Sequence, residues 1–157
     1  MLTHGHFDHT GAVNEVRNAL GIPVIAHRNS DEYLLDAYMN LSIECGPTII
    51  INDAEYVDDG KVISLAVSQD FSLKVIYTPG HTTDSVTLYS DKDNVAFVGD
   101  TIFRGSIGNY RYPGGNLRDL EDSIINRILT LPDETILLSG HSVQTTVGAE
   151  KRRYGLI

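Results

Sequence analysis

Seven histidine and aspartate side chains have the residue types and spacing of a metal site. Four of them fall within the short segment 4–9, and three follow singly much later in the chain. Neutral imidazole and carboxylate groups are ligands that zinc, iron and manganese all accept. The candidate ligands, in chain order, are His4, His6, Asp8, His9, His81, Asp100 and His141.

The segment 4–9 can direct its polar side chains to one place. In an extended chain, residues two apart point to the same side, so His4, His6 and Asp8 share one side. A turn into the helix that follows would bring His9 round to the same side. We therefore expect this segment to supply four ligands at the end of a strand.

The three later ligands each come directly after a glycine at the end of an expected strand. Pro79 and Gly80 bend the chain before His81, and Asp100 and His141 follow Gly99 and Gly140. We therefore expect every candidate ligand to lie just beyond a strand end, where loops converge.

The surrounding elements alternate between helices and strands. Helical spacing predicts a helix over 12–20 that Gly21 ends. A second helix, capped by Asn29 or Ser30, is expected from 31 to 37 or beyond. A third follows the cap residue Asn116 and has an apolar face that reaches Leu131. Apolar and β-branched runs predict strands at 22–26, 62–67, 73–77, 85–89, 95–98 and 135–138. Segment 40–52 reads as irregular and 105–115 as a long loop, and a final helix follows Thr145. The pattern predicts a single α/β domain, 1–157, with helices packed outside sheets.

The ligand pattern resembles the metallo-β-lactamase superfamily, whose hallmark is His-x-His-x-Asp-His. The resemblance implies the αββα sandwich of that family and a pair of metal ions. His4, His6 and His81 would hold the first metal, Asp8, His9 and His141 the second, and Asp100 would bridge them.

Paired metals imply hydrolytic chemistry. Two cations that share a water lower its pKa and present it as hydroxide, and they polarise a substrate carbonyl. Asp100 would act catalytically as the bridge and Asp8 by orienting the hydroxide. Zinc is the expected metal, with iron and manganese as alternatives, because histidine and aspartate suit all three.

Segments 99–108 and 140–151 are similar to glyoxalase II-like proteins, which hydrolyse glutathione thioesters. Because the chain stops soon after His141, it resembles their short bacterial branch. The implied activity is that of a thioester hydrolase, with a small ester or lactone as the nearest alternative substrate. Persulfide dioxygenases share the fold but use one iron, which would leave Asp8, His9 and His141 without a metal. A metal-binding but inactive fragment is the third alternative.

Two residues on the loop after Asp100 are candidates for substrate binding. The Arg104 guanidinium could meet a substrate carboxylate, and the Tyr110 phenol could reach its carbonyl. A solvated loop is the competing interpretation, and it is favoured for Tyr110, Arg111 and Tyr112. His27 and Cys45 are expected to be structural.

Composition narrows the class of partner and the compartment. A formal net charge of -9 argues against nucleic acid, whose binding depends on clustered Lys and Arg. The sequence has no apolar run long enough for a membrane span and no signal peptide, so we expect a cytoplasmic protein that acts on a small molecule. The lone cysteine fits a reducing compartment.

The start of the sequence offers little scaffold before His4. Because a strand usually needs about five residues, we expect the N-terminal strands of the family's fold to be absent. Exposed sheet edges could then support homo-oligomers, and metal affinity would fall because ligand geometry depends on its surroundings.

Overall fold

The computed structural model describes residues 1–65 and 67–156 and consists of helices around one large sheet. The sheet has six strands in the order β10-β9-β6-β5-β4-β3. Only the β6–β9 pair is parallel, and the other neighbours are antiparallel. The strands are β3 (Val62–Leu65), β4 (Ser68–Tyr77), β5 (Val86–Ser90), β6 (Val95–Gly99), β9 (Ile136–Ser139) and β10 (Thr145–Thr146).

Two smaller sheets complete the strands. β1 (Ile25–His27) pairs in parallel with β2 (Glu55–Val57), and β7 (Ile102–Phe103) pairs with β8 (Ser106–Ile107). Val57 of β2 packs against the cluster of Val75, Val86 and Leu88 in the large sheet, so the small parallel sheet contacts the large one. The α/β class is confirmed, and within the described residues the second sheet of the sandwich contains β1 and β2.

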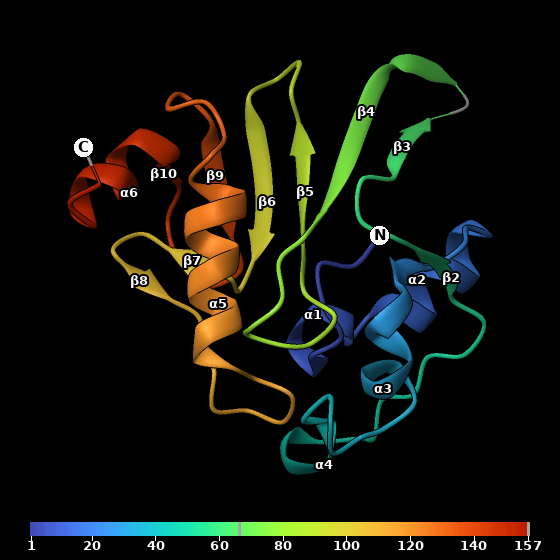
Figure 1. Cartoon of the computed structure of the whole chain (residues 1–157). Coiled ribbons are helices and arrows are strands. Elements are labelled where there is room, and N and C mark those ends of the chain that lie inside the picture. Colours follow the sequence, from blue (N-terminus) through green and yellow to red (C-terminus); the bar gives the residue numbers. More distant parts are fainter. Residues whose placement is uncertain (66, 157) are drawn as a thin grey trace.

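Most helices are short. They are α1 (Phe7–Thr10), α2 (Val13–Leu20), the 3-10 turn η1 (Arg28–Ser30), α3 (Asp31–Leu34), α4 (Ser42–Cys45), α5 (Leu117–Ser123), its π-helical continuation η2 (Ile124–Ile128), and α6 (Val147–Arg153). Figure 1 shows α5 against the large sheet, with α1, α2 and α3 grouped near the N-terminus. No helix in the described ranges has the length and apolarity to cross a membrane.

Several predicted boundaries were wrong for local reasons. The strand expected at 22–26 begins only at Ile25, after Pro23, which cannot donate a ladder hydrogen bond. The helix expected to reach 37 ends at Leu34, because the Asp36 carboxylate accepts hydrogen bonds from the amides of Tyr38 and Met39 and starts a new turn.

Other predicted segments differ in extent. Segment 40–52, expected to be irregular, contains α4, and the loop expected at 105–115 contains β8. The strand expected at 62–67 ends at Leu65, and position 66 lies outside the described residues. The helix after Asn116 ends at Ile128 rather than Leu131, its final turn π-helical, while Asn116 caps it through the amides of Arg118 and Asp119 as expected.

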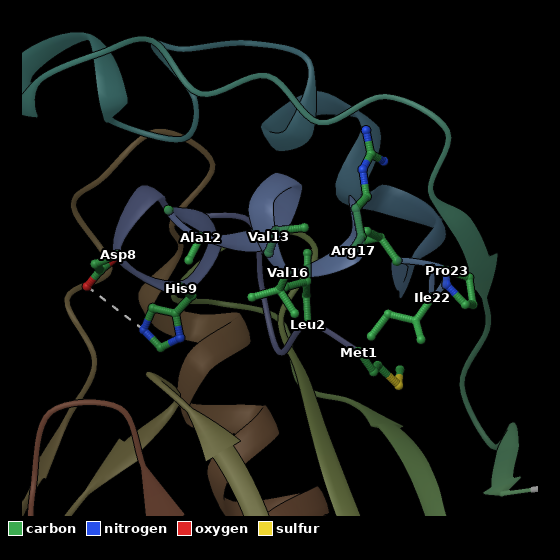
Figure 2. A pocket seen from close by; sticks show the side chains of 12 residues that line it. Met1, Leu2, Asp8, His9, Ala12, Val13, Val16, Arg17, Ile22 and Pro23 are labelled. Atoms are coloured by element: carbon green, nitrogen blue, oxygen red, sulfur yellow. Dashed lines mark ion pairs between the residues drawn. The ribbon is translucent and has the colours of Figure 1, made fainter. Parts of the chain in front are cut away.

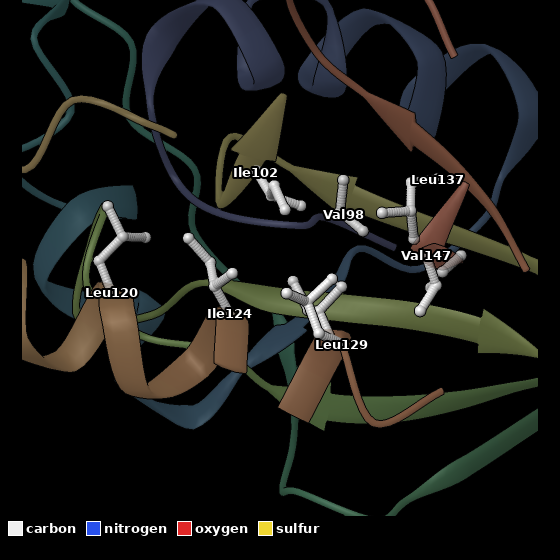
Figure 3. Packing of buried hydrophobic residues seen from close by; sticks show 9 residues of the cluster. Val98, Ile102, Leu120, Ile124, Leu129, Leu137 and Val147 are labelled. Atoms are coloured by element: carbon white, nitrogen blue, oxygen red, sulfur yellow. The ribbon is translucent and has the colours of Figure 1, made fainter. Parts of the chain in front are cut away.

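The main hydrophobic core lies between α5–η2 and the large sheet. Figure 3 shows Leu120, Ile124 and Leu129 facing Val98 and Leu137 across this core. The apolar spacing of the helix therefore buries one face, as amphipathic helices do. The same packing holds the ends of β6 and β9, from which two candidate ligands emerge.

A matched pair of substitutions tests this core. Ile128 is 0% exposed, whereas Ile125, in the same helical turn, is 48% exposed. We expect Ile128→Ala to lower the free energy of unfolding by about 3 kcal/mol, because it leaves a cavity. Ile125→Ala should cost less than about 0.5 kcal/mol. Urea denaturation measures both, and equal losses would contradict the assigned core.

An apolar groove lies beside the N-terminus. Its volume is about 340 Å³, and it is lined by side chains from the N-terminal segment, α2 and the residues before β1. Figure 2 shows Val13, Val16 and Ile22 along it, with Asp8 and His9 at one end. Val16 and Leu20 remain 47% and 66% exposed, whereas Val13 packs against a buried cluster around Val24 and Leu34, so only part of the apolar face of α2 is covered.

Candidate metal centre

The seven candidate ligands come together at one end of the large sheet. Three of them have ligand atoms within 4.8 Å of one another in a buried group, His4, His6 and His81. A second group with the same spacing contains Asp8, His9 and His141, and a third contains His4, His9 and Asp100. The structure thus gathers residues from four separate stretches of the sequence.

The first segment takes the shape that its sequence suggests. His6 is extended (φ -64°, ψ 152°) and precedes α1 directly. The amide of His9 and the hydroxyl of Thr10 both donate to the His6 carbonyl, at 3.0 Å each. This single helical turn carries His9 round toward the other ligands, so a short helix not predicted as such positions it.

Glycines let the later ligands approach closely. Gly80 has φ +129°, and a Cβ there would lie 2.2 Å from the Leu120 amide nitrogen. A Cβ on Gly140 would lie 2.4 Å from Asp100 Oδ1 and 2.7 Å from His9 Cε1. Since real Cβ atoms do not approach so closely, glycine is required before His81, and a Cβ before His141 would force the side chain of Asp100 or His9 to move.

Asp100 stands between the two groups. Its Oδ2 lies 3.8 Å from His81 Nε2 and 3.3 Å from His141 Nε2, and its Oδ1 lies 3.3 Å from His9 Nε2. Asp8 Oδ2 lies 2.8 Å from His141 Nε2. One carboxylate therefore reaches imidazoles of both groups.

The donor set fits divalent metals. Within the described part of the chain, His4 Nε2, His6 Nε2 and Asp100 Oδ1 are buried without a hydrogen-bond partner. His6 Nδ1 and His81 Nε2 face each other at 3.0 Å. Buried polar atoms normally have partners, and a cation is the partner that several converging imidazoles and carboxylates can share.

Burial sets the protonation of the first group. Desolvation, followed by the neighbouring imidazoles, lowers the pKa of His4 well below its usual value. Burial lowers the pKa of His6 to about 3 and also lowers the pKa of His81. These three rings are therefore neutral at physiological pH, which is the form that binds metal.

The carboxylate of Asp100 acts in the opposite direction on His9. Burial alone would lower the pKa of His9, but the negative charge of Asp100, whose Oδ1 lies 3.3 Å from His9 Nε2, raises it above the usual value. Burial would raise the pKa of Asp100, but the contact with His9 lowers it, so this carboxyl is ionised at neutral pH.

The two groups differ in access to solvent. His4, His6 and His81 are 1%, 3% and 2% exposed, whereas the side chains of His141 and Asp8 are 54% and 34% exposed. The second group thus forms the open side of the cluster, and a small molecule can approach there.

Several supporting residues were not singled out from the sequence. His81 Nδ1 donates to the Asn109 carbonyl at 2.7 Å, which leaves Nε2 free to face the cluster. Asp84, 0% exposed, accepts a hydrogen bond from the Ser30 hydroxyl at 2.7 Å and faces the Gly5 amide between His4 and His6. Burial raises the pKa of Asp84 to about 6. Only the position of Asp84 close after His81 could have pointed to it.

The two substrate-binding candidates have different surroundings. The Arg104 amide donates to the Ser142 hydroxyl beside His141, and its side chain lines a groove of about 290 Å³ with Gln144 and Arg153. Tyr110 packs against the main core. Tyr112, interpreted as solvated, has its ring centroid 5.6 Å from that of His6.

The family follows from this fold and this cluster of ligands. The sequence profile of the metallo-beta-lactamase superfamily matches residues 1–141, and the chain belongs to that superfamily. It is 39% identical to the probable metallo-hydrolase YqgX of Bacillus subtilis, over 96% of this chain and 71% of that protein. It is 32% identical to the hydroxyacylglutathione hydrolase GloC of Haemophilus influenzae, over 97% and 72%.

Solved structures agree with this assignment. The BLEG-1 B3 metallo-beta-lactamase superposes with a TM-score of 0.88 at 38% identity, covering 96% of this chain and 72% of that one. TTHA1623 in a di-iron-bound form superposes with a TM-score of 0.83 at 32% identity, covering 99% and 75%. The chain is therefore shorter than these relatives, as the sequence indicated.

Proposed function

We propose that the chain is a binuclear metal-dependent hydrolase of thioesters, of the S-acylglutathione type or closely related. Two metals would be held by His4, His6 and His81 and by Asp8, His9 and His141, with Asp100 shared. The observation that carries this proposal is the position of Asp100 Oδ2, 3.8 Å from His81 Nε2 and 3.3 Å from His141 Nε2.

The residues of the site would have separate roles in the reaction. When bound, paired divalent cations supply an acidified water and a Lewis acid for the substrate carbonyl. Asp8, half-open to solvent beside His141, would orient the attacking water through its carboxylate. The buried histidines would keep their rings neutral and fixed, and the substrate would enter from the side of Asp8 and His141.

The thioester class is supported by a relative. GloC, at 32% identity over nearly the whole chain, is named a hydroxyacylglutathione hydrolase. Zinc is the metal we propose, but the same donors suit iron, and TTHA1623 was solved in a di-iron-bound form. Elemental analysis therefore forms part of the test.

The deciding experiment combines metal analysis of the purified chain with an activity panel. We expect two metals per chain and thiol release from S-lactoylglutathione. Lactone, ester and β-lactam substrates test the neighbouring hydrolases, and a thiol persulfide with oxygen uptake tests a mononuclear iron dioxygenase. One iron with oxygen consumption would overturn the proposal, and two metals without turnover of any thioester would overturn its substrate class.

Arg104 offers a test of how substrate is held. Its guanidinium is exposed in a groove beside the His141 loop, where it could bind a carboxylate of the thiol carrier. We expect Arg104→Ala to raise KM about tenfold with little change in kcat, because it removes binding that ground and transition states share. A fall in kcat at unchanged KM would contradict this role. The control is Arg118→Ala, because Arg118 lies in a separate groove on α5.

A further inference from the structure

Tyr112 presents an exposed aromatic ring beside the buried histidines. Its ring centroid lies 5.6 Å from that of His6 and 6.2 Å from that of His81, edge-on to both. The residue is nevertheless 42% exposed. An aromatic ring that is partly free next to a ligand cluster can bury apolar surface of a bound molecule.

The loop that carries Tyr112 is held firmly. Tyr33, 0% exposed, donates from its hydroxyl to the Pro113 carbonyl at 3.2 Å and accepts from the Thr83 amide at 3.0 Å. A Cβ on Gly114 would lie 2.1 Å from the same hydroxyl. The ring of Tyr33 is 5.9 Å from that of His6. One buried tyrosine thus fastens the Tyr112 loop to the loops of His6 and His81.

The two ends of a thioester can be assigned to different parts of the site. The Arg104 amide contacts Ser142, next to His141, and the residue lines a neighbouring groove with Gln144 and Arg153, where an anionic thiol carrier would find positive charge. Tyr112 is uncharged and lies by His6 and His81. The carbon chain of the acyl group is bonded directly to the reacting carbonyl carbon, so its first atoms must lie close to the ligands, and the ring of Tyr112 beside His6 and His81 offers it an apolar contact.

We propose that Tyr112 is a specificity-determining residue whose exposed ring packs against the acyl group of the substrate. This inference rests on the proposed hydrolase function. It makes the enzyme selective for acyl groups with apolar carbon next to the carbonyl, and it gives a role to a residue outside the metal ligands.

Binding of simple carboxylates tests the inference without turnover. Acetate, butyrate and hexanoate are titrated calorimetrically into the metal-loaded chain, with the metal content of each sample measured. We expect affinity to rise with chain length in the native chain, since each buried methylene adds binding. Tyr112→Ala should weaken hexanoate about tenfold and acetate less than about twofold, and Tyr112→Phe should behave as the native chain.

Control variants and outcomes separate the two proposals. Tyr56→Ala, an exposed tyrosine on β2, should leave the series unchanged. An equal chain-length dependence in native and Tyr112→Ala protein, or none in the native protein, overturns the role of Tyr112. If Tyr112→Ala flattens the series but no thioester is hydrolysed, the acyl contact stands and the hydrolase proposal fails.

Discussion

Replacing Asp100 with alanine is expected to lower thioester turnover more than about 100-fold and to reduce metal content below two per chain. Residues that merely support a ligand typically cost 10- to 100-fold when changed, and Asp100 reaches imidazoles of both groups directly. Without its charge, the five imidazoles of the cluster would face a single remaining carboxylate, that of Asp8. Elemental analysis and steady-state kinetics measure the two effects.

The control for this variant is an exposed carboxylate outside the cluster. Asp91→Ala, in the turn after β5, should retain both metals and full turnover. Because Asp100 is only 8% exposed, circular dichroism and melting of each variant in the presence of metal will show whether the fold is kept. Unchanged turnover in a folded Asp100→Ala protein would contradict the proposal of a binuclear metal site.

Gly140→Ala is the second substitution with a large expected effect, although it changes no ligand. Its new Cβ would lie 2.4 Å from Asp100 Oδ1 and 2.7 Å from His9 Cε1, so one of these side chains must move. We expect metal content to fall toward one per chain and turnover to fall about 10- to 100-fold, as for other changes that disturb ligand geometry.

The same loop supplies the control for Gly140→Ala. Val143 is 65% exposed, and Val143→Ala should leave metal content and kinetics unchanged. Full metal content and normal turnover in Gly140→Ala would mean that the close contact between this glycine and Asp100 is not required. Loss in both variants would instead indicate general sensitivity of the loop.

The sequence predicted those helix ends that depend on contacts between residues close together in the chain. Asn116 caps α5 by accepting hydrogen bonds from nearby amides, and Gly21 ends α2 in the left-handed region. Both depend on contacts within one helical turn, so the residue type at the helix end is enough to predict them. Predicted helix and strand ends were wrong where a side-chain contact changed the path of the chain. At Asp36, for example, the carboxylate accepts a hydrogen bond from the Tyr38 amide and starts a new turn after Leu34.

The supporting residues of the site depend on long-range contacts. Tyr33, Asp84 and Asn109 touch loops that are remote in sequence, and apart from the position of Asp84 close after His81, nothing in their local spacing marks them. Tyr110 and Tyr112 are two residues apart on one loop, yet one packs against the core and the other stands beside His6. Which ring faces the cluster is decided by the fold of the loop on Tyr33.

The sequence by itself determined the family, the α/β class and the set of candidate ligands. Chemistry restricts metal binding to few side chains, and the dense segment His4 to His9 followed by single ligands after glycine is a pattern that local information carries. The family resemblance implied that Asp100 stands between two groups, but only the tertiary structure decided its distances to them, that one group is buried and the other open, and that Tyr112 lies beside His6. The physical reason is that these properties are distances and burial between remote segments, which arise only when the chain packs.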